Sequence, residues 1–352
     1  MKIASIVGAR PQFIKASPVS RALQHAGHHE VIVHTGQHYD AQMSDVFFTE
    51  MGIARPDHFL EIGSGSHAEQ TGRMMVAVEH TLLAERPDCA IVYGDTNTTL
   101  AAALAAVKLG VRLAHVEAGL RSFNRTMPEE HNRVLTDHCS DLLFCPTQTA
   151  VANLAREGIR LDVHLVGDVM YDAVLHFAER ARAQSRVLST VGVQPREYML
   201  ATVHRAYNTD DPVVLQRLLG ALEAIGIPVI FPLHPRTRAR LATVSNGIEP
   251  KHVRLVDPVG YLDMLALEQH AKVILTDSGG VQKEAFFFEV PCVTLRPETE
   301  WVETVSSGWN VLAGSDPDAI VAAARRAARP AAAPPPVFGD GKAAHRIAAL
   351  LS

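Results

Sequence analysis

The sequence predicts an α/β fold of two domains, each with a parallel sheet and helices on both of its faces. Three observations predict it. The chain of 352 residues is long for a single core of usual size, which favours two domains. Strand and helix patterns alternate in both halves, an order typical of parallel sheets. Several of the strand candidates are unbroken apolar runs, as in strands that are covered on both faces.

The first half alternates between short apolar runs and longer amphipathic segments. Strands are expected at residues 2–7, 31–35, 89–93, 111–115 and 142–145. Helices are expected at residues 14–24, 41–51, 67–85, 98–109 and 129–139. In a sheet of this kind the carboxyl ends of the strands form the crevice where ligands bind.

The second half repeats the pattern. Strands are expected at residues 198–202, 229–232, 253–256, 273–276 and 291–294, with helical segments between most of them. The clearest stretch, Lys272–Phe288, reads as a buried strand, a tight turn and a helix. The domain boundary is expected where GDVM follows a strand, which divides residues 1–167 from residues 168–336.

The tail has a different composition. A helix rich in alanine and arginine is expected at 321–329, followed by PAAAPPPV, a stiff extended spacer. A short helix at 342–350 ends the chain, and residues 337–352 either pack back on the first domain or fray.

Composition excludes several classes of function. A net charge of −5 argues against a surface that coats nucleic acid, which would be basic. No apolar run reaches membrane-spanning length, and the first residues are not apolar enough for a signal peptide, so a cytoplasmic protein without a membrane partner is expected. The four cysteines form no CxxC pair, and the eighteen histidines show no metal-ligand spacing, so no metal is expected.

Polar residues directly after the predicted strands are the candidate functional residues. The first strand is followed by GARPQFIK, in which Arg10 and Lys15 are positively charged. Arginine grips a diphosphate with two parallel hydrogen bonds, although a plain surface arginine is the alternative.

Acidic residues follow two further strands of the first half. Asp95 and Glu117 come after neighbouring apolar runs, and Glu129 opens the helix after Pro128. Each has a structural alternative, because Asp95 suits a helix cap and Glu129 suits a helix dipole or an ion pair with Arg133. Three acids at one edge of a sheet are suited to proton transfer.

In the second half, His204 and Arg205 follow one strand, His234 and Arg236 follow another, and Arg296 follows a third. These residues suggest an anion-binding pocket. The alternative is that they only stabilise turns through hydrogen bonds. The turn Ser278–Gly280 opens a helix, whose free N–H groups and dipole favour a phosphate. Glu284, one turn further, is placed to accept hydrogen bonds from ribose hydroxyls. The GxGxxG, P-loop and GxSxG motifs are absent.

The motifs GARPQFIK, YGDTNTT, HVEAGLRS, MPEEHNR, VGDVMYD, HR, TDSGGVQKEA and TEWVE resemble those of the non-hydrolysing UDP-N-acetylglucosamine 2-epimerases, in order from about residue 3 to 314. The resemblance implies two Rossmann-like domains in the glycosyltransferase-B arrangement with an interdomain cleft, usually in a homodimer. It implies interconversion of UDP-GlcNAc and UDP-ManNAc through 2-acetamidoglucal, for bacterial surface polysaccharide precursors and without a cofactor.

The resemblance also implies roles for individual residues. The acidic catalytic trio corresponds to Asp95, Glu117 and Glu129, and the histidine of the HR motif to His204. The family's phosphate and uridine contacts correspond to Arg10, His234, Ser278, Gly279, Gly280 and Glu284. Further candidate contacts to the UDP-sugar, not taken from the family, are Lys15, Arg133, Arg205 and Arg296. The stretch GQHYDAQM resembles a loop that reads a second, regulatory UDP-GlcNAc, which makes Gln37, His38 and Gln42 candidate allosteric contacts.

Two departures from the family pattern leave the sugar open. Tyr207 replaces an acid in the HRxEN pattern, and Trp301 replaces the arginine of TERPE. Trp301 and the FNRTMPEE loop are closer to epimerases of UDP-2,3-diacetamido-glucuronic acid, whose extra carboxylate would need a cation such as Arg121 or Arg125. The same residues are also compatible with a glycosyltransferase of this architecture, a UDP-sugar sensor or a hydrolysing epimerase.

Overall fold

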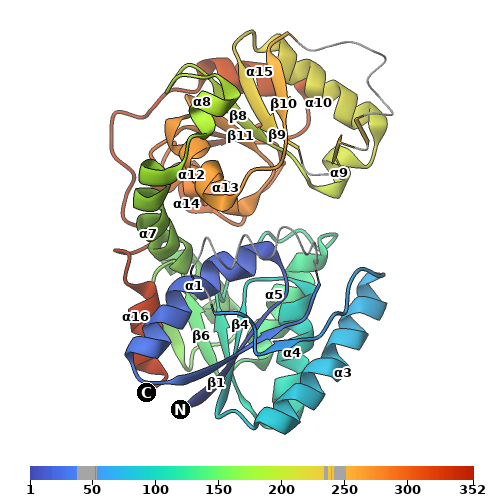
Figure 1. Ribbon diagram of the computed structural model, residues 1–352, viewed down its shortest axis with the longest axis vertical. Helices are drawn as coiled ribbons and strands as arrows, with labels where there is room; N and C mark the ends of the chain where they lie inside the picture. The colour runs from blue at the N-terminus through green and yellow to red at the C-terminus, as the bar shows by residue number, and fades with distance from the viewer. Residues whose placement is uncertain (38–51, 53, 234–236, 239, 242–250) are drawn as a thin grey trace. The chain divides into compact units, whose positions relative to one another are not determined.

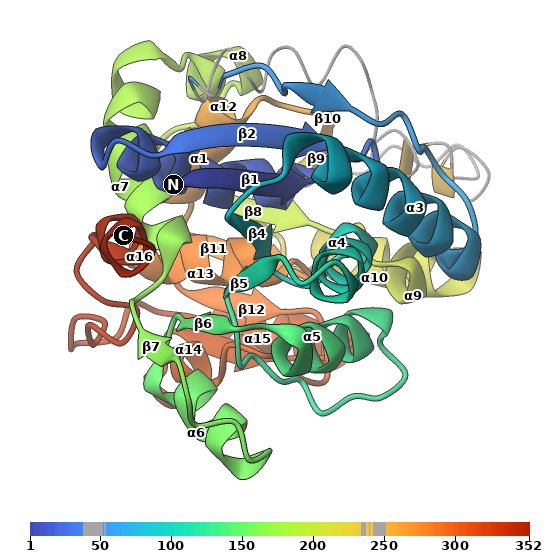
Figure 2. The ribbon, with the colours of Figure 1, turned by 90° about the horizontal axis from the view of Figure 1, so that it is seen from below.

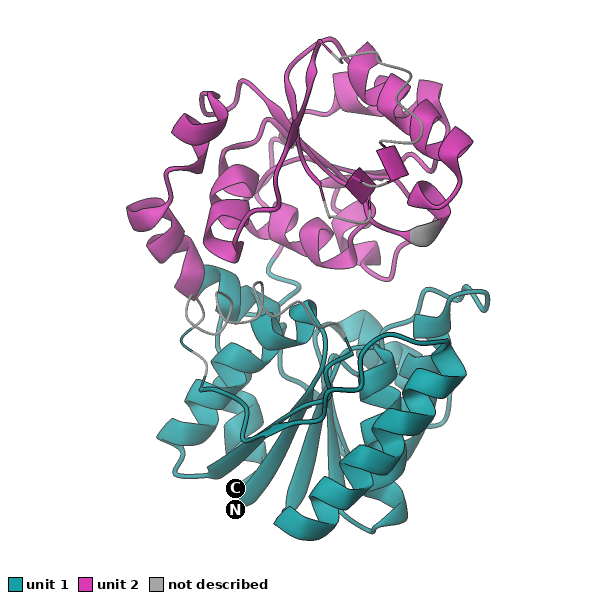
Figure 3. Ribbon diagram, turned by 45° about the vertical axis from the view of Figure 1, so that its right-hand side comes forward, with its two compact units in different colours: residues 1–175, 336–352 teal, residues 176–335 magenta. Residues whose placement is uncertain are grey.

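The computed structural model describes residues 1–37, 52, 54–233, 237–238, 240–241 and 251–352. The chain divides into two compact units, Met1–Leu175 with Pro336–Ser352, and His176–Pro335 (Figure 3). The division falls inside α7 (Val169–Gln184) rather than after residue 167. The first turn of α7 stays with the first unit because the Asp168 amide donates to the Phe338 carbonyl at 2.9 Å.

The first unit contains a parallel sheet, of which β1, β4 and β6 are labelled in Figure 1. Its strand order is β3-β2-β1-β4-β5-β6-β7 among the described residues. Its strands are β1 (Lys2–Val7), β2 (His29–His34), β3 (His58–Phe59), β4 (Cys89–Tyr93), β5 (Arg112–Val116), β6 (Leu142–Cys145) and β7 (Val163–Leu165). Apart from α7, its helices are α1 (Arg10–His25), α3 (His67–Glu85), α4 (Asn97–Lys108), α5 (Pro128–Cys139), α6 (Gln148–Arg156) and α16 (Ala343–Leu350). Helices α3, α4 and α5 cover one face of the sheet, and α1 and α16 lie on the other (Figure 2).

The second unit is built in the same way, with the strand order β10-β9-β8-β11-β12-β13 among the described residues. Its strands are β8 (Met199–Thr202), β9 (Val229–Pro232), β10 (Val253–Val256), β11 (Val273–Thr276), β12 (Cys292–Thr294) and β13 (Asn310–Leu312). Its helices are α8 (Val187–Val191), α9 (Ala206–Thr209), α10 (Pro212–Ala224), α12 (Tyr261–His270), α13 (Gly279–Phe287), α14 (Val302–Ser306) and α15 (Pro317–Arg326).

Each face of the second sheet carries its own apolar core. Met199 and Ala201 pack with α10 and α15, whereas Leu200, between them in β8, packs on the opposite face with α12 and α13. Because both faces are covered, the strands are continuous apolar runs rather than alternating ones. Continuous apolar runs are easily recognised, which explains why these strand positions could be predicted from the sequence.

Some helices begin earlier than expected because their first residues favour a helix N-terminus. Pro11 and Pro317 occupy the first turns of α1 and α15, where a missing N–H costs nothing. The Asp316 side chain accepts from the Ala319 amide at 2.8 Å, which starts α15 at Pro317 rather than at 321. The helix expected at 41–51 lies outside the described residues. No helix within the described ranges is both long and apolar enough to cross a bilayer.

The C-terminal helix packs back on the first unit, which decides between the two alternatives for the tail. Helix α16 lies against α1 (Figure 1). The carboxylate of Asp172, in α7, accepts from the amides of Ala343 and Ala344 at 3.2 and 2.8 Å. The Arg346 guanidinium donates to the Val166 carbonyl at 2.9 Å. The tail is therefore anchored by hydrogen bonds as well as by apolar contact.

We expect Asp172→Ala to lower the free energy of unfolding by about 1–2 kcal/mol, because it removes the cap of α16. Urea unfolding followed by circular dichroism measures the change. Asp340→Ala is the control, since the Asp340 side chain is 54% exposed and pairs only on the surface with Arg346. Equal losses in the two variants would contradict a capping role for Asp172.

Candidate active site

The strand orders place a topological switch point in each unit, between β1 and β4 in the first and between β8 and β11 in the second. In open parallel sheets, ligands bind beyond the carboxyl ends of the strands at such a point. Arg10 and Asp95 follow the first pair of strands, and His204 and Ser278 follow the second. Each unit therefore gathers its own predicted site residues at one edge of its own sheet.

Gln12 holds the loop after β1. Its side-chain oxygen accepts from the amides of Gly8 and Ala9 at 2.8 and 3.0 Å. Its amide group donates to the Tyr93 carbonyl at 2.9 Å, which ties this loop to the end of β4. A Cβ at Gly8 would overlap the side chain of Thr98, so only glycine allows this approach. Gln12 lies within the GARPQFIK motif but was not predicted as a site residue.

A lysine–glutamate ion pair lies at the end of the central strands. Lys15, in α1, contacts the carboxylate of Glu117, which is the residue directly after β5. Glu117 is only 4% exposed and has a left-handed φ of 70°. A non-glycine residue in this region is strained, and such strain is concentrated at functional sites. A Cβ at Gly94 would lie 3.0 Å from the Lys15 ammonium and 3.2 Å from the Glu117 carboxylate, so Gly94 leaves room for the pair.

Helix α5 fixes Asp95, the second predicted acid. Arg133 donates to its carboxylate at 2.6 Å, and Asn132 donates to its carbonyl at 2.9 Å. The N-cap of α4 is Thr96, whose side chain accepts from the Thr99 amide. The N-cap position of α4 is therefore Thr96 rather than Asp95, and the Asp95 carboxylate is held by a buried arginine. Glu129 lies half-buried in the first turn of the same helix.

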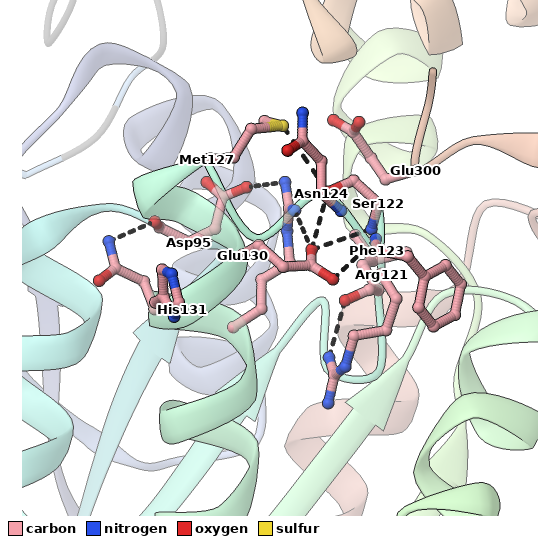
Figure 4. Close-up of polar contacts among 12 residues, drawn as sticks. Asp95, Arg121, Ser122, Phe123, Asn124, Met127, Glu130, His131 and Glu300 are labelled. Atoms are coloured by element: carbon pink, nitrogen blue, oxygen red, sulfur yellow. Dashed lines mark hydrogen bonds and ion pairs between the residues drawn. The ribbon is translucent and has the colours of Figure 1, made fainter. Parts of the chain in front are cut away.

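Glu130, next to the predicted Glu129, closes the loop that precedes α5 (Figure 4). Its carboxylate accepts from the Ser122 amide and hydroxyl, both at 2.9 Å, and from the Phe123 amide at 2.8 Å. Arg133 also donates to it at 2.9 Å. One arginine thus links Asp95 to the anchor of this loop, which makes Glu130 a positioning residue.

A buried network of polar and charged side chains connects β5 to α5. The Asp137 carboxylate faces His115 Nδ1 at 2.7 Å and accepts from Arg121 at 2.7 Å. The other ring nitrogen of His115 faces the Gly94 carbonyl at 2.8 Å. Burial alone would raise the pKa of Asp137, but hydrogen bonds and charge from His115 and Arg121 outweigh it and hold that pKa below its usual value. The network therefore fixes the backbone at Gly94.

The corresponding anchor of the second unit is Asp277, which follows β11. Its buried carboxylate accepts from the amides of His204 and Arg205 at 3.1 and 3.0 Å, and from the Asn208 side chain at 3.0 Å. The ring of His204 is 50% exposed, with Nδ1 3.4 Å from Asp277. Asp277 therefore fixes the backbone of the HR motif while the histidine ring reaches solvent at the strand end.

The helix that opens at Ser278 has a closely packed first turn. Ser278 caps α13 by accepting from the Val281 amide at 3.5 Å. A Cβ at Gly279 would overlap the Glu300 carboxylate and lie 3.2 Å from Trp301 Nε1. Arg296 is buried and donates to Glu300 at 2.8 Å. Glycine is thus required for packing at this turn, in addition to any approach of a ligand.

Comparison with known proteins identifies the family. The family model described as UDP-N-acetylglucosamine 2-epimerase matches residues 21–352. The chain belongs to this family. A Pseudomonas aeruginosa relative, UDP-2,3-diacetamido-2,3-dideoxy-D-glucuronate 2-epimerase, is 52% identical over 100% of this chain and 99% of its own. The solved Methanocaldococcus jannaschii UDP-GlcNAc 2-epimerase, in complex with UDP-GlcNAc and UDP, has a TM-score of 0.92 at 44% identity, covering 100% of this chain and 99% of that one.

The UDP-GlcNAc 2-epimerase of Neisseria meningitidis, solved bound to UDP-GlcNAc, has a TM-score of 0.89 at 29% identity, covering 100% of this chain and 99% of that one. These relatives confirm the predicted class, a Rossmann-like α/β protein of the glycosyltransferase-B type, and confirm that this epimerase-family chain is an isomerase. A Streptomyces glycosyltransferase at 16% identity and a TM-score of 0.54 shares the fold alone.

The structure of this epimerase distinguishes its two candidate cations, Arg121 and Arg125, by their exposure. Arg121 was a candidate partner for a carboxylate on the sugar, but it is 3% exposed. Its guanidinium is engaged by Asp137 and, through two hydrogen bonds of 2.7 Å, by Glu157. Arg125, the other candidate, is exposed on the loop that Glu130 anchors.

The allosteric candidates are only partly described. The Gln37 side-chain oxygen accepts from the Thr98 amide and hydroxyl at 2.9 and 2.8 Å, at the start of α4. Gln37 is buried there, so its oxygen already has a structural role. His38, Gln42 and the substrate-contact candidate His234 lie outside the described residues.

Proposed function

We propose that this protein interconverts UDP-GlcNAc and UDP-ManNAc, as a cytoplasmic homodimer that supplies surface polysaccharide precursors. The observation that carries the proposal is a pair of acids after neighbouring strands, each held by a cation: the half-buried Asp95 with Arg133, and the buried Glu117 with Lys15. Paired carboxylates at one sheet edge suit a reaction that removes a proton and returns one.

The chemistry explains why acids and anion-binding groups both occur among the candidate residues. The C2 hydrogen of the sugar is not beside a carbonyl and is weakly acidic, so departure of UDP must assist its removal. The C1–O bond breaks with its electron pair going to the diphosphate, the C2 proton goes to a carboxylate, and a C1–C2 double bond forms. Arg10, His204 and the amides of the Ser278–Gly280 turn are suited to the charge that develops on UDP.

Return of the proton on the opposite face of C2, followed by re-addition of UDP, gives the epimer. Asp95, Glu117 and Glu129 share these proton transfers in our proposal. The Lys15 and Arg133 contacts support it, because a cation hydrogen-bonded to each carboxylate holds that carboxylate in a fixed position.

Proton NMR of UDP-GlcNAc with the protein in deuterated water tests the reaction. One deuterium is expected at C2 of both epimers, and an epimer without it would refute the mechanism. Release of UDP only with an acceptor would indicate a glycosyltransferase, and free N-acetylmannosamine a hydrolysing enzyme. Tight binding of UDP-GlcNAc without turnover would indicate a sensor.

Analytical ultracentrifugation tests whether the protein is a dimer in solution.

The diacetamido-uronate is the second candidate substrate. It is favoured by the 52% identity to the Pseudomonas aeruginosa enzyme, which exceeds the 44% identity to the Methanocaldococcus jannaschii enzyme. With Arg121 buried, the exposed Arg125 is the candidate cation for the sugar carboxylate.

We expect Arg125→Gln to raise KM for the uronate about tenfold and leave KM for UDP-GlcNAc unchanged, since an ion pair at a binding site contributes about 1–2 kcal/mol. Equal effects on both substrates would contradict this assignment.

We expect Gly94→Ala to lower kcat about tenfold, because the new methyl group displaces the Lys15–Glu117 pair from its productive geometry. Gly110→Ala is a matched control. Gly110 has a φ of 70°, close to the 64° of Gly94, but nothing lies within 4 Å of its Cβ position. Both variants should lose about 1–2 kcal/mol of stability from backbone strain, and only Gly94→Ala should lose turnover. Equal kcat in the two variants would contradict the prediction.

A further inference from the structure

A buried network of neutral polar side chains is centred on Gln282, the fourth residue of α13. Gln282 is 0% exposed. Its side-chain oxygen accepts from the Thr299 hydroxyl at 2.6 Å and from the side-chain amide of Asn310 at 3.2 Å. Its backbone amide donates to the Ser278 carbonyl at 3.2 Å, which closes the first turn of α13. Polar groups are costly to bury, so the purpose of this network calls for an explanation.

The network extends to the backbone of Trp301. The Thr299 hydroxyl accepts from the Trp301 amide at 3.1 Å, and the Thr304 hydroxyl donates to the Trp301 carbonyl at 2.7 Å. The side-chain amide of Asn310 donates to the Thr304 hydroxyl at 3.0 Å as well as to Gln282. Both polar backbone groups of Trp301 are therefore fixed by side chains that bond, directly or through Asn310, to Gln282.

The segment Thr299–Trp301 packs closely against the first turn of α13. A Cβ at Gly279 would lie 2.5 Å from the Glu300 carboxylate and 3.2 Å from Trp301 Nε1. There is no room between this segment and the turn for even a methyl group, so a shift of the segment changes the packing around the Gly279 backbone. The bonds to Gln282 thus set the position of the turn Ser278–Gly280 from two sides, through the helix and through the segment.

We infer that Gln282 and Thr299 are positioning residues, whose hydrogen bond holds the segment Thr299–Trp301 against Gly279 and keeps the amides of the turn Ser278–Gly280 in place for a diphosphate. The inference rests on the proposed function, which assigns the diphosphate of UDP to this turn. Backbone donors bind an anion best when their geometry is fixed before the ligand arrives. Both side chains act through the turn, because each is buried in the unit.

The group expected to contact the ribose is held from another direction. Glu284 lies further along α13, and the Tyr261 hydroxyl, in α12, donates to its carboxylate at 3.1 Å. This contact comes from α12 and not from the segment Thr299–Trp301. Loosening the segment should therefore weaken binding of the diphosphate more than binding of the nucleoside.

Isothermal titration calorimetry with UDP and with uridine tests the inference. Thr299→Val keeps the shape of the side chain and removes its hydroxyl, so it should weaken UDP binding about tenfold and leave uridine binding within about twofold. Thr299→Ser keeps the hydroxyl and should retain UDP affinity within about twofold. Thr136→Val is the matched control and should change neither affinity. Thr136 is also buried, in α5, and its hydroxyl has no hydrogen-bond partner within the described ranges.

The outcomes separate this inference from the proposed function. Absence of UDP binding by the unmodified protein would overturn the proposed function. Normal UDP binding by Thr299→Val would overturn only the positioning role, and equal losses for UDP and uridine would show a purely structural one. A loss in Thr299→Ser as large as in Thr299→Val would assign the effect to packing rather than to the hydroxyl.

Gln282→Met provides the same comparison if Thr299→Val does not fold. It removes the oxygen that Thr299 and Asn310 share. The side-chain nitrogen of Gln282, which is lost with it, has no hydrogen-bond partner in the part of the chain that the structure describes. The variant should therefore also weaken UDP binding more than uridine binding, and equal effects on the two ligands would contradict the inference.

Discussion

Replacing Glu117 with glutamine is expected to lower kcat by about 10²–10⁴-fold, the range observed when a positioned acid or base is lost. The substitution preserves the shape of a side chain that is 4% exposed and removes its ability to accept a proton. Lys15 loses its charged partner, but an amide oxygen still accepts a hydrogen bond from it. Binding of UDP, which the proposed function assigns mainly to the second unit, should remain close to that of the unmodified protein.

Steady-state kinetics, UDP titration and deuterium exchange at C2 together check the role of Glu117. Exchange should fall in parallel with kcat, whereas a residue that only assists sugar binding would raise KM and leave exchange at saturation intact. Glu69→Gln is the control, since it makes the same change on a side chain that is 62% exposed in the first turn of α3. Normal turnover by Glu117→Gln would remove Glu117 from the mechanism.

The sequence predicted where the strands end but not how the residues there are paired. Apolar runs predicted β4, β6, β9, β10 and β11 with the bounds that the structure shows. The short strands β3 and β13 carry too few residues for a periodic pattern and were not predicted. Glu117 was predicted because it follows an apolar strand. Its partner Lys15 is 102 residues away, and only the strand order brings the two together.

The supporting residues are the least predictable part of the site. Asp137 and Gln12 lie inside helices, and nothing local distinguishes a buried polar residue that braces a strand end from one that faces solvent. Arg121 shows the reverse case, because a charged residue in a polar loop is expected to be exposed. It is buried and pairs with Asp137 in α5 and with Glu157, directly after α6. The periodicity of a sequence predicts which apolar residues are buried. Whether a polar residue is buried depends on hydrogen-bond partners that are distant in the sequence.

Replacing Asp137 with asparagine is expected to cost about 3–5 kcal/mol of the free energy of unfolding, because it leaves the charge of Arg121 buried without a full counter-charge. Asp137 accepts from Arg121 at 2.7 Å and from the Gly119 amide at 3.1 Å, and His115 Nδ1 lies 2.7 Å from its carboxylate. Asparagine retains one oxygen and introduces a donor where only an acceptor fits. Asp318→Asn, an exposed position in the first turn of α15, should change stability by less than about 0.5 kcal/mol.

The pH dependence separates loss of charge from loss of packing. The folded-state pKa of Asp137 is lowered, so its stabilisation is complete above the unfolded pKa, about 4, and is lost as the pH falls through the lower folded value. The pKa of Glu157 is also lowered, chiefly by its hydrogen bond to Arg121, but Glu157 is present in both proteins and its contribution largely cancels in their difference. The difference in unfolding free energy between the unmodified protein and Asp137→Asn should therefore be largest near neutral pH and shrink below about pH 4. Urea unfolding at both pH values measures it. A difference that stays constant with pH would assign the cost to packing, because cavities and lost contacts do not titrate.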